Sequence, residues 1–144
     1  LCGDVTEMDL PPCGFDALTL MANGMGIGGT EQGTVDLLSR LCRLASPGGT
    51  LVGSARDPLG TDNPEHLAYH AQNRKAGLPP GQLHIRLEYQ DKATGWFPLL
   101  LMERERAERL LLAAGWRPVE WHGGPGGGMY HVVARKPWEV TRDV

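Results

Sequence analysis

Short apolar runs and amphipathic segments alternate along this chain, and glycine or proline separates most of them. Residues 15–22, FDALTLMA, form a nearly continuous apolar run, which is typical of a buried parallel strand. Over residues 34–45, apolar side chains recur at steps of three and four, which predicts an amphipathic helix. The turn SPGG ends that helix, and residues 50–55 predict a second buried strand. This order predicts a βαβ unit, in which the two strands are parallel.

The middle of the chain predicts a helix followed by a hairpin. Asn63 is placed to cap a helix, Pro64 stands at its first position and Gly77 lies just past its end. Residues 83–90 alternate between apolar and polar side chains and turn through DKATG into the apolar WFPLLLM. This pattern predicts two strands joined by a short connection.

The last part of the chain predicts a helix and two closing strands. Residues 103–115 carry apolar side chains at helical spacing, and Glu105 can pair with Arg109 across one turn. The segments RPVEWHG and YHVVARK follow as strands, on either side of the glycine-rich loop GPGGG. Since no linker interrupts the pattern, residues 1–137 are expected to form one unit, with a polar tail over 138–144.

Composition narrows the class of protein. The chain has 144 residues, of which 41% are hydrophobic, and a formal charge of −3, values that fit one globular domain or part of a larger one. This slight acidity provides no basic footprint for nucleic acid, and no apolar run approaches the roughly 20 residues of a membrane helix. The three cysteines lack metal-ligand spacing, which favours a reducing, cytoplasmic compartment.

The segment NGMGIGGT has glycines at the G-x-G-x-x-G spacing of dinucleotide-binding loops, at Gly24, Gly26 and Gly29. In that motif the helix begins within the glycines, so that its free N–H groups meet the pyrophosphate. Here the helix is expected only from about residues 32–34, and the acidic candidate for a ribose, Asp57, comes too late in the chain. The spacing alone is therefore a weak indication of a nicotinamide-dependent oxidoreductase fragment, which stays open as an alternative.

A second interpretation uses more of the chain. The motifs that carry it are, in order, Gly3-Asp4, Phe15-Asp16, Pro47-Gly48-Gly49, a helix ending in AAGW and the final strand YHVVARK. From Gly3 to Pro137 this series resembles the C-terminal part of the class I S-adenosylmethionine-dependent methyltransferases. The resemblance implies a Rossmann-like α/β fold with sheet order 3-2-1-4-5-7-6, of which this chain supplies strands 4-5-7-6, the seventh being antiparallel.

The resemblance also implies that the chain is a fragment, inactive by itself. The family's glycine-rich cofactor loop and its ribose-binding acidic residue belong to earlier strands, which would lie upstream of Leu1. The strand over residues 15–22 would then have an unpaired edge. Such an edge favours self-association, and a non-enzymatic α/β interaction module is a further alternative.

For the cofactor, the resemblance implies binding of S-adenosyl-L-methionine at the carboxyl ends of the strands. Asp4 would accept a hydrogen bond from the adenine amino group, and the backbone N–H of Val5 would donate to a ring nitrogen. Ala22, Asn23 and Gly24 would border the methionine end. A turn or cap aspartate is the alternative role for Asp4, and the Asn-Gly pair is also a common turn former.

For the reaction, the resemblance implies methyl transfer to a small-molecule acceptor. Asn23 would face the transferred methyl group, and Asp57 would act as a base or substrate anchor; a turn residue before Pro58 is the alternative. His66 and His70 have a spacing that can bind metal, but without a third ligand they are interpreted as an exposed pair. Trp96 and neighbouring Phe97 are expected in the core or in a substrate wall.

Overall fold

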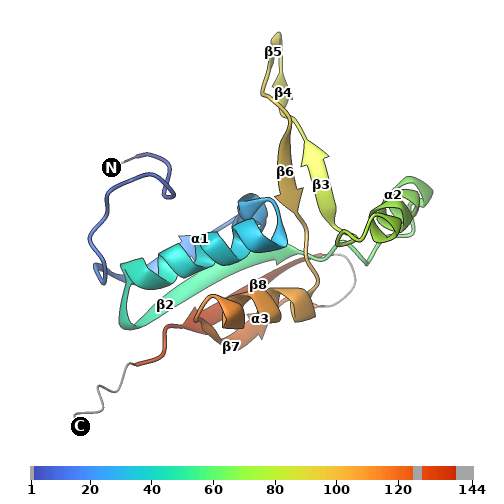
Figure 1. The fold of residues 1–144 in the computed structure, drawn as a ribbon. Coiled ribbons are helices and arrows are strands. Elements are labelled where there is room, and N and C mark those ends of the chain that lie inside the picture. Colours follow the sequence, from blue (N-terminus) through green and yellow to red (C-terminus); the bar gives the residue numbers. More distant parts are fainter. Residues whose placement is uncertain (1, 125–127, 139–144) are drawn as a thin grey trace.

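In the computed structural model, residues 2–124 and 128–138 are described (Figure 1). A four-stranded sheet has the order β1-β2-β8-β7. Its strands are β1 (Phe15–Leu20), β2 (Ala45–Arg56), β7 (Arg117–His122) and β8 (Met129–Arg135). β1 and β2 are parallel, while β8 runs antiparallel to both β2 and β7. This order confirms the expected 4-5-7-6 arrangement and the α/β class.

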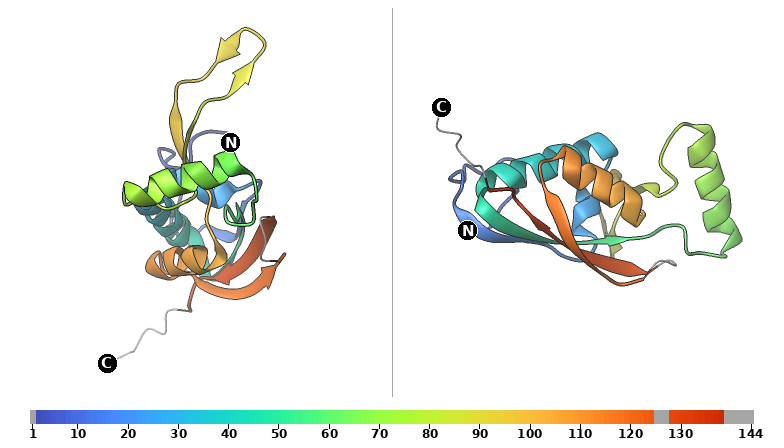
Figure 2. Two further views of the ribbon diagram at one scale, coloured as in Figure 1. Left: turned by 90° about the vertical axis from the view of Figure 1, so that its right-hand side faces the viewer. Right: turned by 90° about the horizontal axis from the view of Figure 1, so that it is seen from below.

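Two helices cover one face of this sheet. They are α1 (Glu31–Leu44) and α3 (Arg104–Ala113), which lie on the same side of the strands in both views of Figure 2. Within the described part of the chain, β1 pairs with β2 alone, so its other edge is unpaired, as expected.

Helix α1 begins at Glu31, slightly earlier than its periodicity predicts. The hydroxyl of Thr30 caps it by accepting a hydrogen bond from the N–H of Gly33 at 3.0 Å. Glu31 binds the guanidinium groups of Arg106 and Arg109. Burial by itself raises the pKa of the Glu31 carboxyl, but these hydrogen bonds and charges outweigh it, so the pKa is lowered. The pairing of Arg109 with Glu31 replaces the expected pairing within α3.

Strand β2 is longer than its apolar run predicts, because the Pro-Gly-Gly turn is included in it. Pairing with β1 jumps from Phe15 opposite Ala45 to Ala17 opposite Thr50, so the extra residues form an irregularity in the strand. Gly48 has φ +74°, a conformation that glycine adopts without strain.

A second unit extends beyond the end of β2 (Figure 1). It consists of helix α2 (Pro64–Lys75) and a two-stranded sheet of β3 (Gln82–Ile85) and β6 (Phe97–Leu100). The short strands β4 (Glu88–Tyr89) and β5 (Lys92–Ala93) pair at the tip of the hairpin. The side chain of Asn63 caps α2 as predicted, accepting from the N–H of Glu65 at 2.9 Å.

The expectation of a core position is wrong for Trp96, which is 60% exposed, and a role as a substrate wall stays a prediction. The guanidinium carbon of Arg86 lies 5.2 Å from the centre of the Trp96 ring, and the His84 ring lies beside it. The projecting hairpin has no layer of side chains over this position, so the indole contacts its polar strand neighbours instead.

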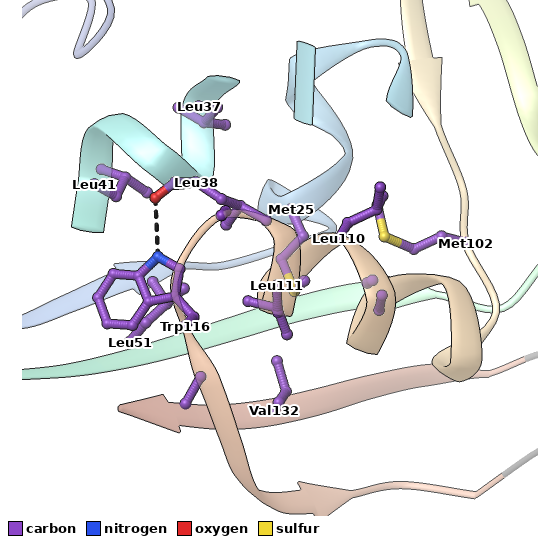
Figure 3. Close-up of a cluster of buried hydrophobic side chains, with 14 of the residues drawn as sticks. Met25, Leu37, Leu38, Leu41, Leu51, Met102, Leu110, Leu111, Trp116 and Val132 are labelled. Atoms are coloured by element: carbon purple, nitrogen blue, oxygen red, sulfur yellow. Dashed lines mark hydrogen bonds between the residues drawn. The ribbon is translucent and has the colours of Figure 1, made fainter. Parts of the chain in front are cut away.

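The core lies between the sheet and its two helices (Figure 3). Trp116 is fully enclosed there, and its indole N–H donates to the carbonyl of Leu38 at 2.9 Å. Met25, which follows β1, is also fully buried among these side chains. The core therefore joins the segment after β1 to both helices.

Two sequence predictions fall partly outside the described residues. The glycine-rich loop before β8 includes residues 125–127, and the polar tail includes residues 139–144. None of the helices in the described part of the chain has the length and apolar character that spanning a membrane requires.

Candidate functional site

The carboxyl ends of β1 and β2 lie side by side. Leu20 at the end of β1 pairs with Gly53 of β2. The hydroxyl of Ser54 donates to the carbonyl of Leu20 at 3.1 Å and accepts from the N–H of Asn23 at 3.3 Å. In open α/β sheets, ligands bind at such carboxyl ends. The carboxyl ends of β1 and β2, which were predicted to border the site, therefore lie together at one edge of the sheet.

Asn23 is the residue that ties these ends together. It is 8% exposed and adopts a left-handed conformation with φ 62°. Its Oδ1 accepts from the N–H of Arg56 at 2.9 Å, and its Nδ2 donates to the carbonyl of Leu100 at 3.5 Å. The Asn23 side chain thus fixes three segments relative to one another: the residues that follow β1, the end of β2 and the end of β6.

The two residues beside Asn23 differ in their accessibility. Ala22 is exposed and has φ 52°, whereas Gly24 is buried at the start of the 3₁₀ helix η1 (Gly24–Gly28). The backbone therefore turns sharply after the carboxyl end of β1, so that it is exposed at Ala22 and buried again at Gly24. Ala22 is the exposed residue of the three predicted to border the cofactor here.

Asp4 and Val5 line a separate hollow of about 610 Å³. The other walls of this hollow come from η1 and helix α1, at Ile27, Gly28, Gly33, Asp36, Leu37, Arg40 and Arg43, with Thr6 beside Asp4. Arg40 donates hydrogen bonds to the carbonyls of Val5 and Met8, which hold the N-terminal segment against α1. Two of the predicted cofactor residues therefore share one hollow with the segment that follows β1.

The Asp4 carboxylate also forms a local turn. Its Oδ1 accepts from the hydroxyl of Thr6 at 2.6 Å and from the N–H of Thr6 at 2.8 Å. These two hydrogen bonds lower the pKa of the exposed Asp4 carboxyl, so it is an anion at neutral pH. Because both bonds end at Oδ1, the second carboxylate oxygen has no partner among the described residues.

Asp57 follows the end of β2 and is half-buried. Its Oδ1 accepts from the N–H of Leu59 at 2.8 Å, and its own N–H donates to the carbonyl of Gly128 at 3.2 Å. Asp57 thus has the hydrogen bond of a turn residue while it lines two hollows. In the smaller one, burial and the charge of Asp57 raise the pKa of the Tyr130 hydroxyl, which donates to the carbonyl of Met102 at 2.8 Å.

The larger of the two hollows is a cavity of about 450 Å³ between the end of β2, helix α2 and the hairpin. Both His66 and His70 line it. The interpretation of an exposed histidine pair is wrong for His70, which is only 6% exposed. Sequence reasoning missed this cavity, although a polar face on α2, with His66, His70 and Asn73 at steps of four and three, could have indicated it.

The structure brings the predicted residues together in two groups rather than one. Asp4 and Val5 share the hollow over α1, whereas Asp57 lies at the cavity beside α2. Asn23 is bonded to Arg56, which lines that second cavity. Within the described residues, no group of three or more His, Cys, Asp or Glu side chains is placed to hold a metal ion.

Comparison with solved structures defines the class of fold. A SAM-dependent methyltransferase from Methanosarcina mazei matches with a TM-score of 0.70 and 11% identity, over 95% of this chain and 66% of the other. One from Bacteroides fragilis, in complex with S-adenosyl-L-homocysteine, matches with a TM-score of 0.68 and 17% identity over 92% and 52%. The 1,6-didemethyltoxoflavin-N1-methyltransferase of Burkholderia thailandensis, with bound 1,6-didemethyltoxoflavin and S-adenosylhomocysteine, has a TM-score of 0.57 and 18% identity over 95% and 50%.

The chain therefore has the fold of the class I S-adenosylmethionine-dependent methyltransferases. It spans about half to two thirds of the length of these three structures. No protein-family model matches the sequence, and no curated protein matches it.

Replacing Asn23 by alanine is expected to destabilise the protein by about 2–5 kcal/mol. The change removes the acceptor of the partly buried Arg56 N–H, at about 1–3 kcal/mol, and places alanine in a left-handed conformation, at about 1–2 kcal/mol. Urea unfolding measures the loss. Asn23→Gly relieves the conformational part and Asn23→Asp keeps the acceptor, so both should lose less than Asn23→Ala. Equal losses in all three variants would contradict the role of Asn23 as the residue that ties the strand ends together.

Proposed function

We propose that this chain is part of an enzyme that transfers a methyl group from S-adenosyl-L-methionine to a small-molecule acceptor. The observation that carries the proposal is the meeting of the β1 and β2 carboxyl ends at one edge of the sheet. Support comes from the shared fold, and from the two similar structures that contain S-adenosylhomocysteine, one of them with a small heteroaromatic substrate.

In this proposal, Asp4 and Val5 hold the adenine ring. The free carboxylate oxygen of Asp4 accepts from the amino group, and the Val5 N–H donates to a ring nitrogen. The fit rests on chemistry present in the hollow: an anionic acceptor, a backbone donor fixed by Arg40 and an apolar wall from Ile27. Ala22, Asn23 and Gly24 border the methionine end, with Asn23 acting as a positioning residue through its backbone contacts.

Methyl transfer is a single displacement at a positively charged sulfonium. The cofactor supplies the activated methyl group, and the protein aligns the acceptor with it, excludes water and removes a proton where the acceptor carries one. Asp57 is half-buried beside the acceptor side of the site and is the proposed substrate anchor or base at the end of β2.

The alternative of a nicotinamide-dependent oxidoreductase is not favoured. Helix α1 begins at Glu31, beyond Gly29, so its N-terminus does not lie within the glycine motif. The Asp57 carboxylate accepts the N–H of Leu59 at the end of β2, as a turn residue does. The glycines instead form a buried 3₁₀ turn.

The unpaired edge of β1 is the proposed site of the next strand of a longer chain. A free parallel edge exposes unpaired N–H and C=O groups and favours pairing with another strand. In the absence of that strand, self-association through β1 is the expected result.

Calorimetric titration of the full-length protein with S-adenosylhomocysteine tests the assignment of the cofactor. Asp4→Ala is expected to weaken binding about 10- to 100-fold, because a hydrogen bond to a charged group contributes about 1.5–3 kcal/mol. Asp4→Asn keeps an acceptor and the turn at Thr6, so its loss should be smaller. The control is Asp9→Ala, at an exposed aspartate of the same segment outside the hollow. If the wild type does not bind S-adenosylhomocysteine, the proposed function is wrong.

A further inference from the structure

Helix α2 has an unusual distribution of side chains. A helix that packs on a protein normally buries an apolar stripe and exposes its polar face. In α2 the buried residues are His70 and Asn73, one turn apart, whereas Leu67 is 47% and Tyr69 is 39% exposed. Apolar burial therefore does not explain how α2 is placed.

Asn73 accounts for how α2 is held. Its Nδ2 donates to the carbonyl of Pro80 at 2.9 Å and to the carbonyl of Gln82 at 2.8 Å, which fastens the end of α2 to the base of the hairpin. Gln82 in turn pairs with Leu100, the residue whose carbonyl Asn23 contacts. Asn73 and Asn23 thus bond to two residues that face each other across the β3–β6 ladder, which links the position of the helix to that of the strand ends.

His70 lies one turn before Asn73 and differs from it in its contacts. Its side chain is as buried as that of Asn73, but among the described residues it has no hydrogen-bond partner. Its ring nitrogens are not among the enclosed side-chain atoms that lack a partner, so they are open to the space that the side chain lines. His70 lines the cavity of about 450 Å³, so a molecule in that cavity can form a hydrogen bond with its imidazole.

The rest of the cavity limits what that molecule can be. Its volume lies within the range of small-ligand pockets. Three of its lining residues are charged, namely Arg56, Asp57 and Glu65, with a formal sum of −1; the others include Pro58, Tyr69, Leu83 and Leu101. The apolar side chains, the Tyr69 ring and the small net charge favour a largely apolar molecule, such as an aromatic compound, without a large charge.

We propose that this cavity is the acceptor pocket of the methyltransferase, and that His70 removes the proton from the acceptor. The substrate class is a small aromatic or heteroaromatic compound that is methylated at an O–H or N–H group. This inference rests on the proposed function and assigns its substrate class and its base; of the two roles proposed for Asp57, it leaves that of substrate anchor.

The proton transfer balances with the displacement. The acceptor O–H or N–H gives its proton to an imidazole nitrogen of His70 as the nucleophile bonds to the methyl carbon and the carbon–sulfur bond breaks. S-Adenosylhomocysteine leaves without charge on sulfur, and the imidazolium later releases the proton to water. Burial, with the charges of Arg74 and His66, lowers the pKa of His70, so its imidazole is neutral and can accept a proton at pH 7.

Other side chains around the cavity are less suited to this role. His66 is exposed and its Nδ1 is hydrogen-bonded to the Thr61 hydroxyl at 3.0 Å, and Asp57 already accepts the N–H of Leu59. The titratable and charged groups near His70 come from α2, at Glu65, His66, Tyr69 and Arg74, and from the end of β2, at Arg56 and Asp57. No such group is contributed by the hairpin residues that line the cavity, Leu83 and Leu101.

The first experiment measures binding of 4-nitrophenol to the full-length protein saturated with S-adenosylhomocysteine. The phenol and phenolate forms of this probe absorb at different wavelengths, so both affinity and proton transfer are observed. His70→Phe fills the position without an acceptor and should weaken binding at least about tenfold. His70→Gln keeps an acceptor and should stay within about threefold. The control His122→Asn, at an exposed histidine on β7, should bind as the wild type does.

The second experiment measures the rate of methylation of 4-nitrophenol against pH. With the wild type, the rate should fall as pH decreases below the ordinary histidine pKa of about 6.5, because protonated His70 cannot accept a proton. His70→Gln should lower the rate about 100-fold, and its remaining pH dependence should follow the ionisation of the phenol alone.

Each outcome separates this inference from the proposed function. Affinity for S-adenosylhomocysteine should be the same in all His70 variants, which also shows that they are folded. If the cofactor product binds but the wild type does not bind 4-nitrophenol, or if His70→Phe binds it equally well, the inference is wrong. If the wild type does not bind S-adenosylhomocysteine, the proposed function itself fails.

Discussion

Replacing Gly26 by alanine is expected to destabilise the protein by about 3 kcal/mol or more. A Cβ at this position would lie 2.0 Å from the carbonyl oxygen of Leu100 and 2.7 Å from Nδ2 of Asn23. The first of these contacts is with backbone, so no change of rotamer relieves it. Either η1 or the end of β6 must move, and the hydrogen bond between Asn23 and Leu100 is then lost.

Urea unfolding and ligand binding together check this prediction. Gly95→Ala is the matched control, because a Cβ there would have no atom within 4 Å; its stability should change by less than about 0.5 kcal/mol. Because Asn23 also binds the N–H of Arg56, Gly26→Ala should further weaken binding of 4-nitrophenol in the cavity beside β2. Equal stability of the two variants would show that the exit of β1 is not tightly packed against β6.

Replacing Trp116 by alanine is expected to destabilise the protein by about 3–5 kcal/mol. The indole is 1% exposed and lies between α1 and the sheet, where its removal leaves a large cavity (Figure 3). Its N–H donates to the carbonyl of Leu38 at 2.9 Å, so the variant also leaves a buried carbonyl without that donor.

Two further variants separate these contributions. Trp116→Phe keeps an aromatic ring but removes the donor, and should lose less stability than Trp116→Ala. Trp96→Ala removes an indole that is 60% exposed and should change the free energy of unfolding by less than about 0.5 kcal/mol. Chemical unfolding of the three variants is the measurement. A loss at Trp96 as large as that at Trp116 would contradict the position of the core.

The sequence by itself determined the order and class of the secondary-structure elements. Local patterns identify these elements, because helices and strands each have a characteristic periodicity. The patterns are the apolar run of residues 15–22, the helical spacing after Thr30 and the Pro-Gly-Gly turn. Parallel pairing of β1 with β2 then follows from the helical crossover that joins them in the βαβ unit. The order of the sheet, including the unpaired edge of β1, was expected only from the resemblance to the methyltransferase family.

Only the tertiary structure decided which side chains meet. His70 is buried although it was expected to be exposed, because it lies on the side of helix α2 that lines the cavity, and Asn73 fastens that helix to the hairpin. Trp96 is exposed although it was expected in the core, because it lies on a projecting hairpin. The sequence around Asn23 is typical of a turn, yet its side chain binds the N–H of Arg56 and the carbonyl of Leu100, which follow it by 33 and 77 residues. A local sequence pattern specifies which face of a helix or strand is apolar. Hydrogen-bond partners so distant in the sequence are specified only when the elements pack together.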